Sequence, residues 1–221
     1  MIDSSESMRA KQAAVNAAAM DLLQASNPAD ETFVVNFSNE AWLDEDFTSD
    51  LGKVRSGLLD ARIGGNTALY DAVITAAAKL EQTGTRARKA LVVITDGEDD
   101  RSRATLKGAI QHVQNLQSPV IYSLGLLYDR QAGDKGGRAQ HDLEALSAET
   151  GGAASFPESS ADIEVAAQAV SRAIRKQYTL GYRLKESTGG GSYHNLKVKA
   201  VSPASETLTV RTRRDYIESK D

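Results

Sequence analysis

The chain of 221 residues has no cysteine, only four prolines and a single tryptophan. The absence of cysteine excludes disulfide bridges, thiolate nucleophiles and thiolate metal sites. No apolar run approaches the ~18 residues that a membrane span requires, so we expect no transmembrane segment in this chain. The net charge is −4, and no stretch interleaves aromatic with basic residues. Nucleic acid is therefore not an expected partner.

Strand and helix patterns alternate over the first 176 residues. The apolar runs at 32–37, 89–95 and 119–127 predict buried strands, with a shorter one at 153–157 and room for a short edge strand within 39–50. Helical periodicity is found at 8–25, 51–61, 67–80, 103–116, 141–150 and 160–176, and residues 128–140 are predicted to form a long loop. This alternation predicts an α/β fold: a doubly wound, Rossmann-like, mostly parallel sheet flanked by helices.

The pattern of apolar and polar residues changes at residue 177. Three segments, 177–185, 192–201 and 206–213, alternate apolar and polar residues and are separated by "ESTGGG" and "SPAS". Such alternation is typical of antiparallel strands with one solvated face. We therefore predict two units, a domain over 1–176 and a C-terminal three-stranded β extension over 177–221 that packs on the domain or completes it.

Small oxygen-bearing side chains occur where strands are predicted to end. "DSSES" opens the chain, "GGNT" precedes the helix at 67–80, and "TDGEDD" ends the most apolar strand. In doubly wound sheets, ligands bind outside the carboxyl ends of strands, where the strand order reverses. If the strands before the first and last motifs are neighbours there, their carboxylates face each other across a crevice. The candidate ligands are Asp3, Ser5, Ser7, Thr67 and Asp96.

These five residues offer only oxygen, which is the donor type that hard cations such as Mg²⁺ prefer. Two carboxylates nearly neutralise the ion while hydroxyls add no charge, so the ion stays electrophilic towards an anionic ligand. Each motif also has a simpler interpretation: Ser5 and Ser7 could cap a helix, Thr67 could cap the next one, and Asp96 could belong to an ordinary turn. The acidic run 98–100 fits a solvated helix cap better than a second cation site.

The order of the three motifs carries more information than any one of them. "DSSES", "GGNTALYDAV" and "ALVVITDGEDD" resemble, in order and spacing, the metal-site segments of the von Willebrand factor type A domain and its metal-ion-dependent adhesion site. The resemblance covers residues 1 to about 176. The tail, with "RKQYTLGYRL", "YHNLKVKAV" and "LTVRTRRDYI", looks like the end of a bacterial subgroup of related proteins.

The resemblance implies a Rossmann-like sheet with Mg²⁺, alternatively Mn²⁺ or Ca²⁺, on its upper face. The five candidate residues would ligate the ion directly or through water, and a Glu or Asp of a partner protein would complete its coordination shell. The implied function is non-enzymatic protein binding, and for the longer protein we expect an exported or cell-envelope location. No signal peptide is recognisable in this chain.

Two other functions stay open. The first is a Mg²⁺-dependent hydrolase with Asp3 as nucleophile or Asp96 orienting a water. Against it, no lysine follows either motif in an obvious position to stabilise a phosphoryl group, and no general base stands out. The second is a scaffold domain with a degenerate metal site.

The family places a hydrophobic central strand before the first motif, whereas here only Met1 and Ile2 precede it. We therefore expect the true start to lie upstream and the first central strand to be truncated. Truncation would leave backbone groups unpaired on both neighbouring strands. We expect the gap to close by strand exchange in a homodimer, by a tail strand folding in, or by rearrangement of the sheet.

Overall fold

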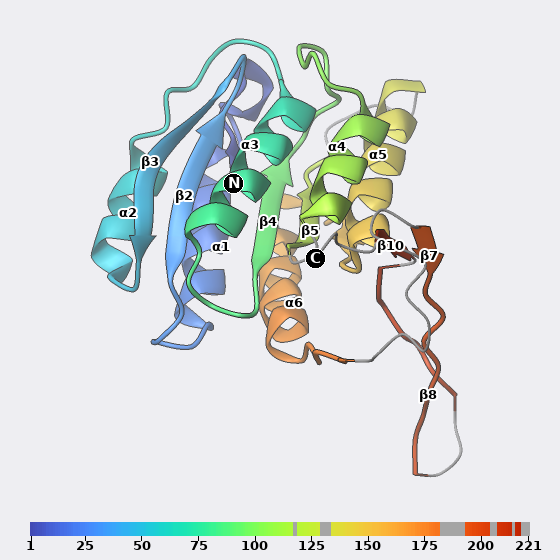
Figure 1. The fold of residues 1–221 in the computed structure, drawn as a ribbon. Helices are drawn as coiled ribbons and strands as arrows, with labels where there is room; N and C mark the ends of the chain where they lie inside the picture. Colours follow the sequence, from blue (N-terminus) through green and yellow to red (C-terminus); the bar gives the residue numbers. More distant parts are fainter. Residues whose placement is uncertain (117–118, 129–133, 182–192, 204–206, 214, 218–221) are drawn as a thin grey trace.

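A six-stranded sheet forms the centre of the molecule (Figure 1). The computed structural model describes residues 1–116, 119–128, 134–181, 193–203, 207–213 and 215–217. The strands of the sheet are β1 (Ile2–Asp3), β2 (Thr32–Phe37), β3 (Ala41–Thr48), β4 (Ala90–Thr95), β5 (Val120–Gly125) and β6 (Ala154–Ser155). Their order is β3-β2-β1-β4-β5-β6, and only β3 runs antiparallel to its neighbour. The predicted doubly wound, mostly parallel sheet is confirmed.

Helices cover both faces of this sheet. They are α1 (Gln12–Gln24), α2 (Leu51–Leu59), α3 (Leu69–Thr83), α4 (Leu106–Asn115), α5 (Asp134–Thr150) and α6 (Ile163–Arg175), with short 3₁₀ turns η1 (Glu6–Met8) and η2 (Ser160–Asp162). One buried apolar cluster joins the sheet to α3, α4 and α5, and a second joins its other face to α1, α2 and α6 (Figure 1). The two-residue period of β4 sends Leu91 and Val93 into the first cluster and Ile94 into the second.

Among the predicted elements, β3 and α5 differ notably from the structure. Strand β3 is eight residues long rather than a short edge segment, and its pairing with β2 contains register irregularities. Helix α5 begins at Asp134, inside the range predicted as a loop, although residues 129–133 lie outside the described part of the chain. The glycines at 136 and 137 disfavour a helix. Burial of Ala139, Leu143 and Leu146 against the core outweighs that propensity.

Among its described residues, the C-terminal segment contains two short antiparallel strand pairs. They are β7 (Tyr193–Asn195) with β10 (Asp215–Ile217), and β8 (Ala200–Val201) with β9 (Thr207–Leu208). The predicted strand at 177–185 is wrong over residues 177–181, where Tyr178 and Leu180 are 91% and 69% exposed, and its remainder lies outside the described residues. An alternating pattern does not make a strand without a surface to cover.

The tail contacts the body of the molecule through α4. The Gln114 side chain donates a hydrogen bond from Nε2 to Asp215 Oδ1 at 3.0 Å, while β8 and β9 project away from the sheet (Figure 1). None of the described tail strands joins the six-stranded sheet, so the expected insertion of a tail strand does not occur among these residues.

Strand β1 lies at the centre of the sheet although it is only two residues long. Ile2 is paired with Asn36 on β2 and with Ile94 on β4, and Asp3 is paired with Phe37. Met1 extends the ladder by one residue, because its carbonyl accepts from Ile94 N at 3.0 Å. The central strand is thus present but short, as predicted, and Asp3 is completely buried.

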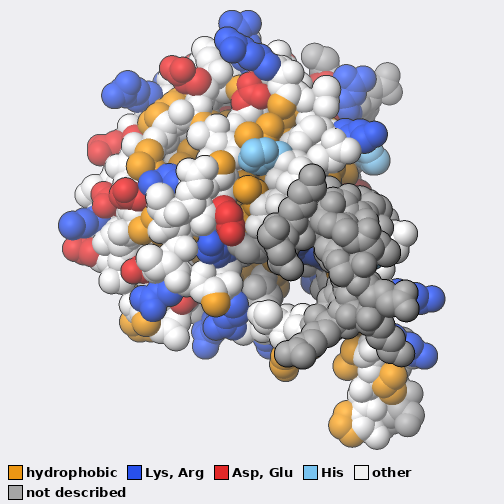
Figure 2. Space-filling view, in the orientation of Figure 1, with side chains coloured by type: hydrophobic (Ala, Val, Ile, Leu, Met, Phe, Trp, Pro, Cys, Tyr) orange, Lys and Arg blue, Asp and Glu red, His pale blue; other side chains and the backbone are white. Residues whose placement is uncertain are grey.

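The surface of the described residues mixes charges of both signs. On the face drawn in Figure 2, acidic and basic side chains are interspersed over the helices. Among the described residues, no helix combines the length and apolar character needed to cross a membrane.

Candidate metal centre

The predicted site lies where the winding of the sheet changes direction. From β1 the chain passes to β2 on one side, whereas from β4 it passes to β5 on the other, and β1 and β4 are neighbours. Asp3 is the last residue of β1, and Asp96 directly follows β4. Both carboxylates therefore reach the same carboxyl edge at the topological switch point.

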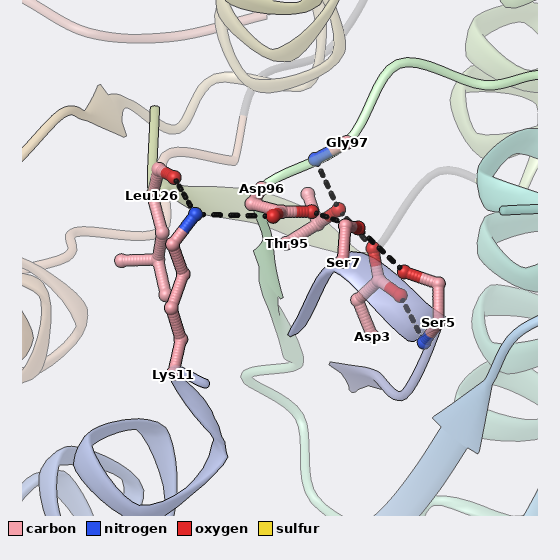
Figure 3. A network of polar contacts seen from close by, with 8 residues as sticks. All are labelled: Asp3, Ser5, Ser7, Lys11, Thr95, Asp96, Gly97 and Leu126. Carbon is pink, nitrogen blue, oxygen red and sulfur yellow. Dashed lines mark hydrogen bonds and ion pairs between the residues drawn. The ribbon is translucent and has the colours of Figure 1, made fainter. Parts of the chain in front are cut away.

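Asp3 is held by the loops on either side of it. Its Oδ1 accepts from Ser5 N at 2.8 Å, and its Oδ2 accepts from Thr95 Oγ1 at 2.5 Å (Figure 3). Thr95 Oγ1 in turn accepts from Gly97 N at 2.9 Å. Burial raises the pKa of the Asp3 carboxyl to about 6, against the opposing effect of the hydrogen bonds from Ser5 and Thr95.

The two serines connect Asp3 to Asp96. Ser5 Oγ lies 3.2 Å from Ser7 Oγ, and Ser7 Oγ donates to Asp96 Oδ1 at 2.8 Å (Figure 3). Ser5 occupies the position that caps η1, but its side chain makes no capping hydrogen bond. Its hydroxyl is directed into the carboxylate network, so the helix-cap interpretation of Ser5 is wrong.

Thr67 reaches the same edge through the glycine turn before α3. Gly64 N donates to Ser4 O at 2.8 Å, and Glu6 N donates to Gly65 O at 3.1 Å, which fastens this turn to the first motif. Gly65 has a φ of 83°, a conformation that favours glycine. The N-cap of α3 is Ala68, so Thr67 is not the cap.

Gly97 gives the position of Thr67 relative to Asp3. A Cβ atom on Gly97 would lie 3.1 Å from Thr67 Cγ2 and 3.2 Å from Asp3 Oδ2. Thr67 is buried, and with Asp3 it flanks the glycine that follows Asp96. The structure thus brings all five candidate residues to one edge of the sheet.

The acidic run after Asp96 has a role that the sequence did not reveal. Asp100 Oδ1 accepts from Thr67 N at 2.8 Å, and Asp99 Oδ2 accepts from Tyr70 N at 3.0 Å. Asp99 thus satisfies an N–H group in the first turn of α3, and Asp100 holds the backbone just before the N-cap of that helix. This is the helix before the two carboxylates in the chain rather than the one after. The predicted capping role is thus right in kind but wrong in partner, because only the tertiary fold brings the two segments together.

Lys11 is the residue of this site that sequence reasoning missed. Its Nζ lies 3.1 Å from Asp96 Oδ2 and 3.1 Å from Leu126 O, and the residue is 6% exposed (Figure 3). The ammonium also lies 5.2 Å from the centre of the Tyr128 ring. The sequence showed no lysine after either motif in an obvious position to stabilise a phosphoryl group, and it did not predict this contact of Lys11 with Asp96. Its only sequence signal was its place just after η1, and a single turn of that kind does not predict where the next side chain points.

The donor set fits a hard cation. Two carboxylates and two serine hydroxyls lie together, the buried Thr67 lies beside them at Gly97, and hard divalent ions take oxygen ligands. Within the described ranges, no group of three or more His, Cys, Asp or Glu has the arrangement of a metal site. An ion here would depend on hydroxyls to supplement Asp3 and Asp96, and it would compete with the Lys11 ammonium for Asp96 Oδ2.

Comparison with known proteins is consistent with this architecture. Residues 1–98 match the family model described as von Willebrand factor type A domain. No curated protein sequence matches the chain.

Three solved structures have a similar fold at low sequence identity. A von Willebrand factor type A structure from Catenulispora acidiphila superposes with a TM-score of 0.63 at 19% identity, covering 77% of this chain and 40% of that one. An aerotolerance-related membrane protein from Bacteroides fragilis gives 0.64 at 20% identity, with 80% and 96% covered. The PilB minor pilin from Streptococcus sanguinis gives 0.59 at 13% identity, with 79% and 60% covered. The family match is thus confined to residues 1–98, and the solved structures share the fold of this chain.

Proposed function

We propose that this chain is a protein-binding module in which a divalent cation, held by Asp3, Ser5, Ser7, Thr67 and Asp96, coordinates an acidic side chain of a partner protein. One observation carries the proposal. Two buried carboxylates from different strands meet serine hydroxyls in a single network at the switch point of the sheet. Such a network brings negative charge out of water, and a bound cation would compensate for that charge.

The chemistry of the donors favours Mg²⁺, with Mn²⁺ and Ca²⁺ as alternatives. Mg²⁺ takes six oxygens and commonly uses one or two carboxylates, whereas Ca²⁺ takes six to eight, often from several carboxylates. The site has two carboxylates, Asp3 and Asp96. When bound, the ion would supply a positive centre for a carboxylate of the partner. Meanwhile the hydrogen bonds from Ser5 N and Thr95 Oγ1 keep Asp3 oriented.

The site suits binding better than turnover. Both oxygens of Asp3 are engaged by hydrogen bonds, and its side chain is buried, so it is poorly placed to attack a substrate. Lys11 nevertheless keeps the hydrolase alternative open, because a lysine beside a carboxylate could neutralise a phosphoryl group. Hydrolysis of p-nitrophenyl phosphate in Mg²⁺ that is lost in Lys11→Met would favour that alternative.

An exported or cell-envelope setting is part of the proposal. Its support is limited to the similar structures, which include a membrane protein and a minor pilin. Their sequence identity to this chain is 20% and 13%, so they show a shared fold, and the location stays an expectation.

Unfolding in Mg²⁺ and in chelator tests the metal role. An ion that binds only the folded chain stabilises it by about 2.7 kcal/mol at a hundred times its dissociation constant. We expect this response in the native chain and its loss in Asp96→Ala. The matched control is Asp60→Ala, which removes an exposed carboxylate at the end of α2 and should leave the response intact. An Asp96→Ala variant that still responds like the native chain would overturn the metal assignment.

A second arm tests the acidic partner. Glutarate carries the carboxylate group of a glutamate side chain, and it should add stabilisation in Mg²⁺ but not in chelator. If Mg²⁺ stabilises the chain while glutarate adds nothing at any concentration, the ion is structural and the binding role fails.

A further inference from the structure

A buried ammonium group lies inside the candidate metal centre. Lys11 is 6% exposed, and its Nζ lies 3.1 Å from Asp96 Oδ2 (Figure 3). The carboxylate is buried as deeply, because the side chain of Asp96 is 3% exposed. Water therefore screens this pair little, and the charge of Lys11 acts strongly on any group that binds next to Asp96.

Three groups of the protein hold the ammonium in place. Besides Asp96, Leu126 O accepts from Nζ at 3.1 Å, and the centre of the Tyr128 ring lies 5.2 Å from Nζ. Leu126 is completely buried. The ammonium is thus a fixed part of the site, unlike a surface lysine whose charge moves freely in solvent.

Lys11 contacts only one of the two oxygens of Asp96. The other oxygen, Oδ1, accepts from Ser7 Oγ at 2.8 Å, and Ser7 Oγ lies 3.2 Å from Ser5 Oγ. The ammonium and the serine hydroxyls therefore lie on different oxygens of the same carboxylate. A cation held on the serine side would share the charge of Asp96 with Lys11, so each would reduce the attraction of Asp96 for the other.

The buried charges do not balance when a divalent cation is added. Asp3 and Asp96 are two carboxylates and Lys11 is one ammonium, so these three side chains together carry one net negative charge. A divalent cation at this site would leave one positive charge in excess. An uncompensated buried charge is costly, and one carboxylate from outside the chain would compensate for it.

The other acidic side chains at this edge have less effect on the buried network. Glu6 and Glu98 each pair with an exposed arginine. Asp99 and Asp100 accept hydrogen bonds from backbone N–H groups. Charges that are paired or in contact with water are screened more strongly than a buried charge. The charge of Lys11 therefore dominates the balance at Asp96.

We propose that Lys11 selects the charge of the group that the site binds, because its ammonium weakens the binding of the cation alone and strengthens the binding of an anionic group to the cation-loaded site. This role rests on the proposed function and adds to it the residue that makes the site require an anion. The partner group is accordingly a carboxylate of Asp or Glu rather than a neutral amide of Asn or Gln.

Two dissociation constants test this role, and isothermal titration at neutral pH measures both. The first is that of Mg²⁺ for the chain alone, and the second is that of glutarate for the Mg²⁺-loaded chain. Lys11→Gln removes the charge and keeps an N–H donor for Asp96 or Leu126 O. We expect this variant to bind Mg²⁺ about tenfold more tightly and glutarate about tenfold more weakly than the native chain, within the usual range of coupling between sites.

The opposite directions of the two shifts separate charge from structure, because a distorted site would bind both Mg²⁺ and glutarate more weakly. Lys11→Met removes the charge and the donor together, and it should shift both constants in the same directions as Lys11→Gln. The matched control is Lys53→Met, which removes an exposed ammonium from the first turn of α2 and should leave both constants at their native values. Thermal unfolding in saturating Mg²⁺ is measured first for each variant.

Three outcomes would overturn the role of Lys11. The first is native values of both constants in Lys11→Gln, and the second is weaker binding of both ligands. The third is that neither Lys11 variant folds in saturating Mg²⁺, because a cation that binds these variants more tightly should stabilise them.

The native chain separates failure of this role from failure of the proposed function. If the native chain binds no Mg²⁺, the proposed function fails and the role of Lys11 fails with it. If the native chain binds Mg²⁺ and then glutarate, and Lys11→Gln does so with the same constants, only the role of Lys11 fails.

Discussion

The buried carboxyl of Asp3 makes a sharp prediction about stability and pH. Burial raises the pKa of the Asp3 carboxyl from its ordinary value of 3.8 to about 6 in the folded chain. The folded state therefore binds the proton more tightly than the unfolded state. This raised pKa is opposite to the usual behaviour of a carboxyl in an ion pair. Its contribution to stability is fully present below pH 3.8 and is lost as the pH rises through about 6.

The size of the effect follows from the shift. About two pKa units at 1.36 kcal/mol each give a loss of about 3 kcal/mol of unfolding free energy between pH 3.5 and pH 7. Asp3→Asn removes the titration while keeping the shape of the side chain and an oxygen that can accept from Ser5 N. The variant should consequently gain stability relative to the native chain as the pH rises through that window.

Urea unfolding in chelator, at half-unit steps of pH, measures this difference. The comparison must be between the two proteins, because other groups also titrate. Burial lowers the pKa of the Met1 amino group to about 5, which makes stability rise between about pH 5 and 8 in both proteins. That contribution cancels in the difference. If the two stability curves stay parallel from pH 3.5 to 7, the account of Asp3 is refuted.

Two further substitutions separate metal binding from packing. Lys11→Met leaves the buried Asp96 carboxylate without its ammonium partner, so in chelator the variant should lose about 3–5 kcal/mol of unfolding free energy. The stabilisation by Mg²⁺ should increase, because the ion no longer competes with Nζ for Asp96. A Mg²⁺ response that shrinks would contradict this. Asp100→Ala removes the acceptor for Thr67 N and should cost about 1 kcal/mol in urea unfolding. The substitution should also weaken the binding of Mg²⁺. An unchanged midpoint in a Mg²⁺ titration would mean that this hydrogen bond does not position Thr67.

Local pattern was enough to predict most of the helices and strands. A strand buried on both faces requires a continuous apolar run, as in β4, and a helix buried along one side requires apolar residues at the helical period, as in α3. Both patterns are properties of short segments of the sequence. The order of the three oxygen-rich motifs also placed Asp3 and Asp96 at neighbouring strand ends, since parallel strands share a carboxyl edge. Pattern failed for two different reasons. The side chains of Tyr178 and Leu180 are exposed, so residues 177–181 have no packing surface that would form the predicted strand. At α5, burial of Leu143 and Leu146 outweighs the low helix propensity of its glycines.

What the sequence by itself determined is the fold class and the type of donor at the candidate site. Only the tertiary structure decided which groups meet across long separations: Lys11 with Asp96, and Asp100 with the backbone of Thr67. The physical reason is that periodicity reports which side of an element is buried, a property of neighbouring residues. A hydrogen bond or an ion pair depends on distances of about 3 Å, which are set by how separate elements pack.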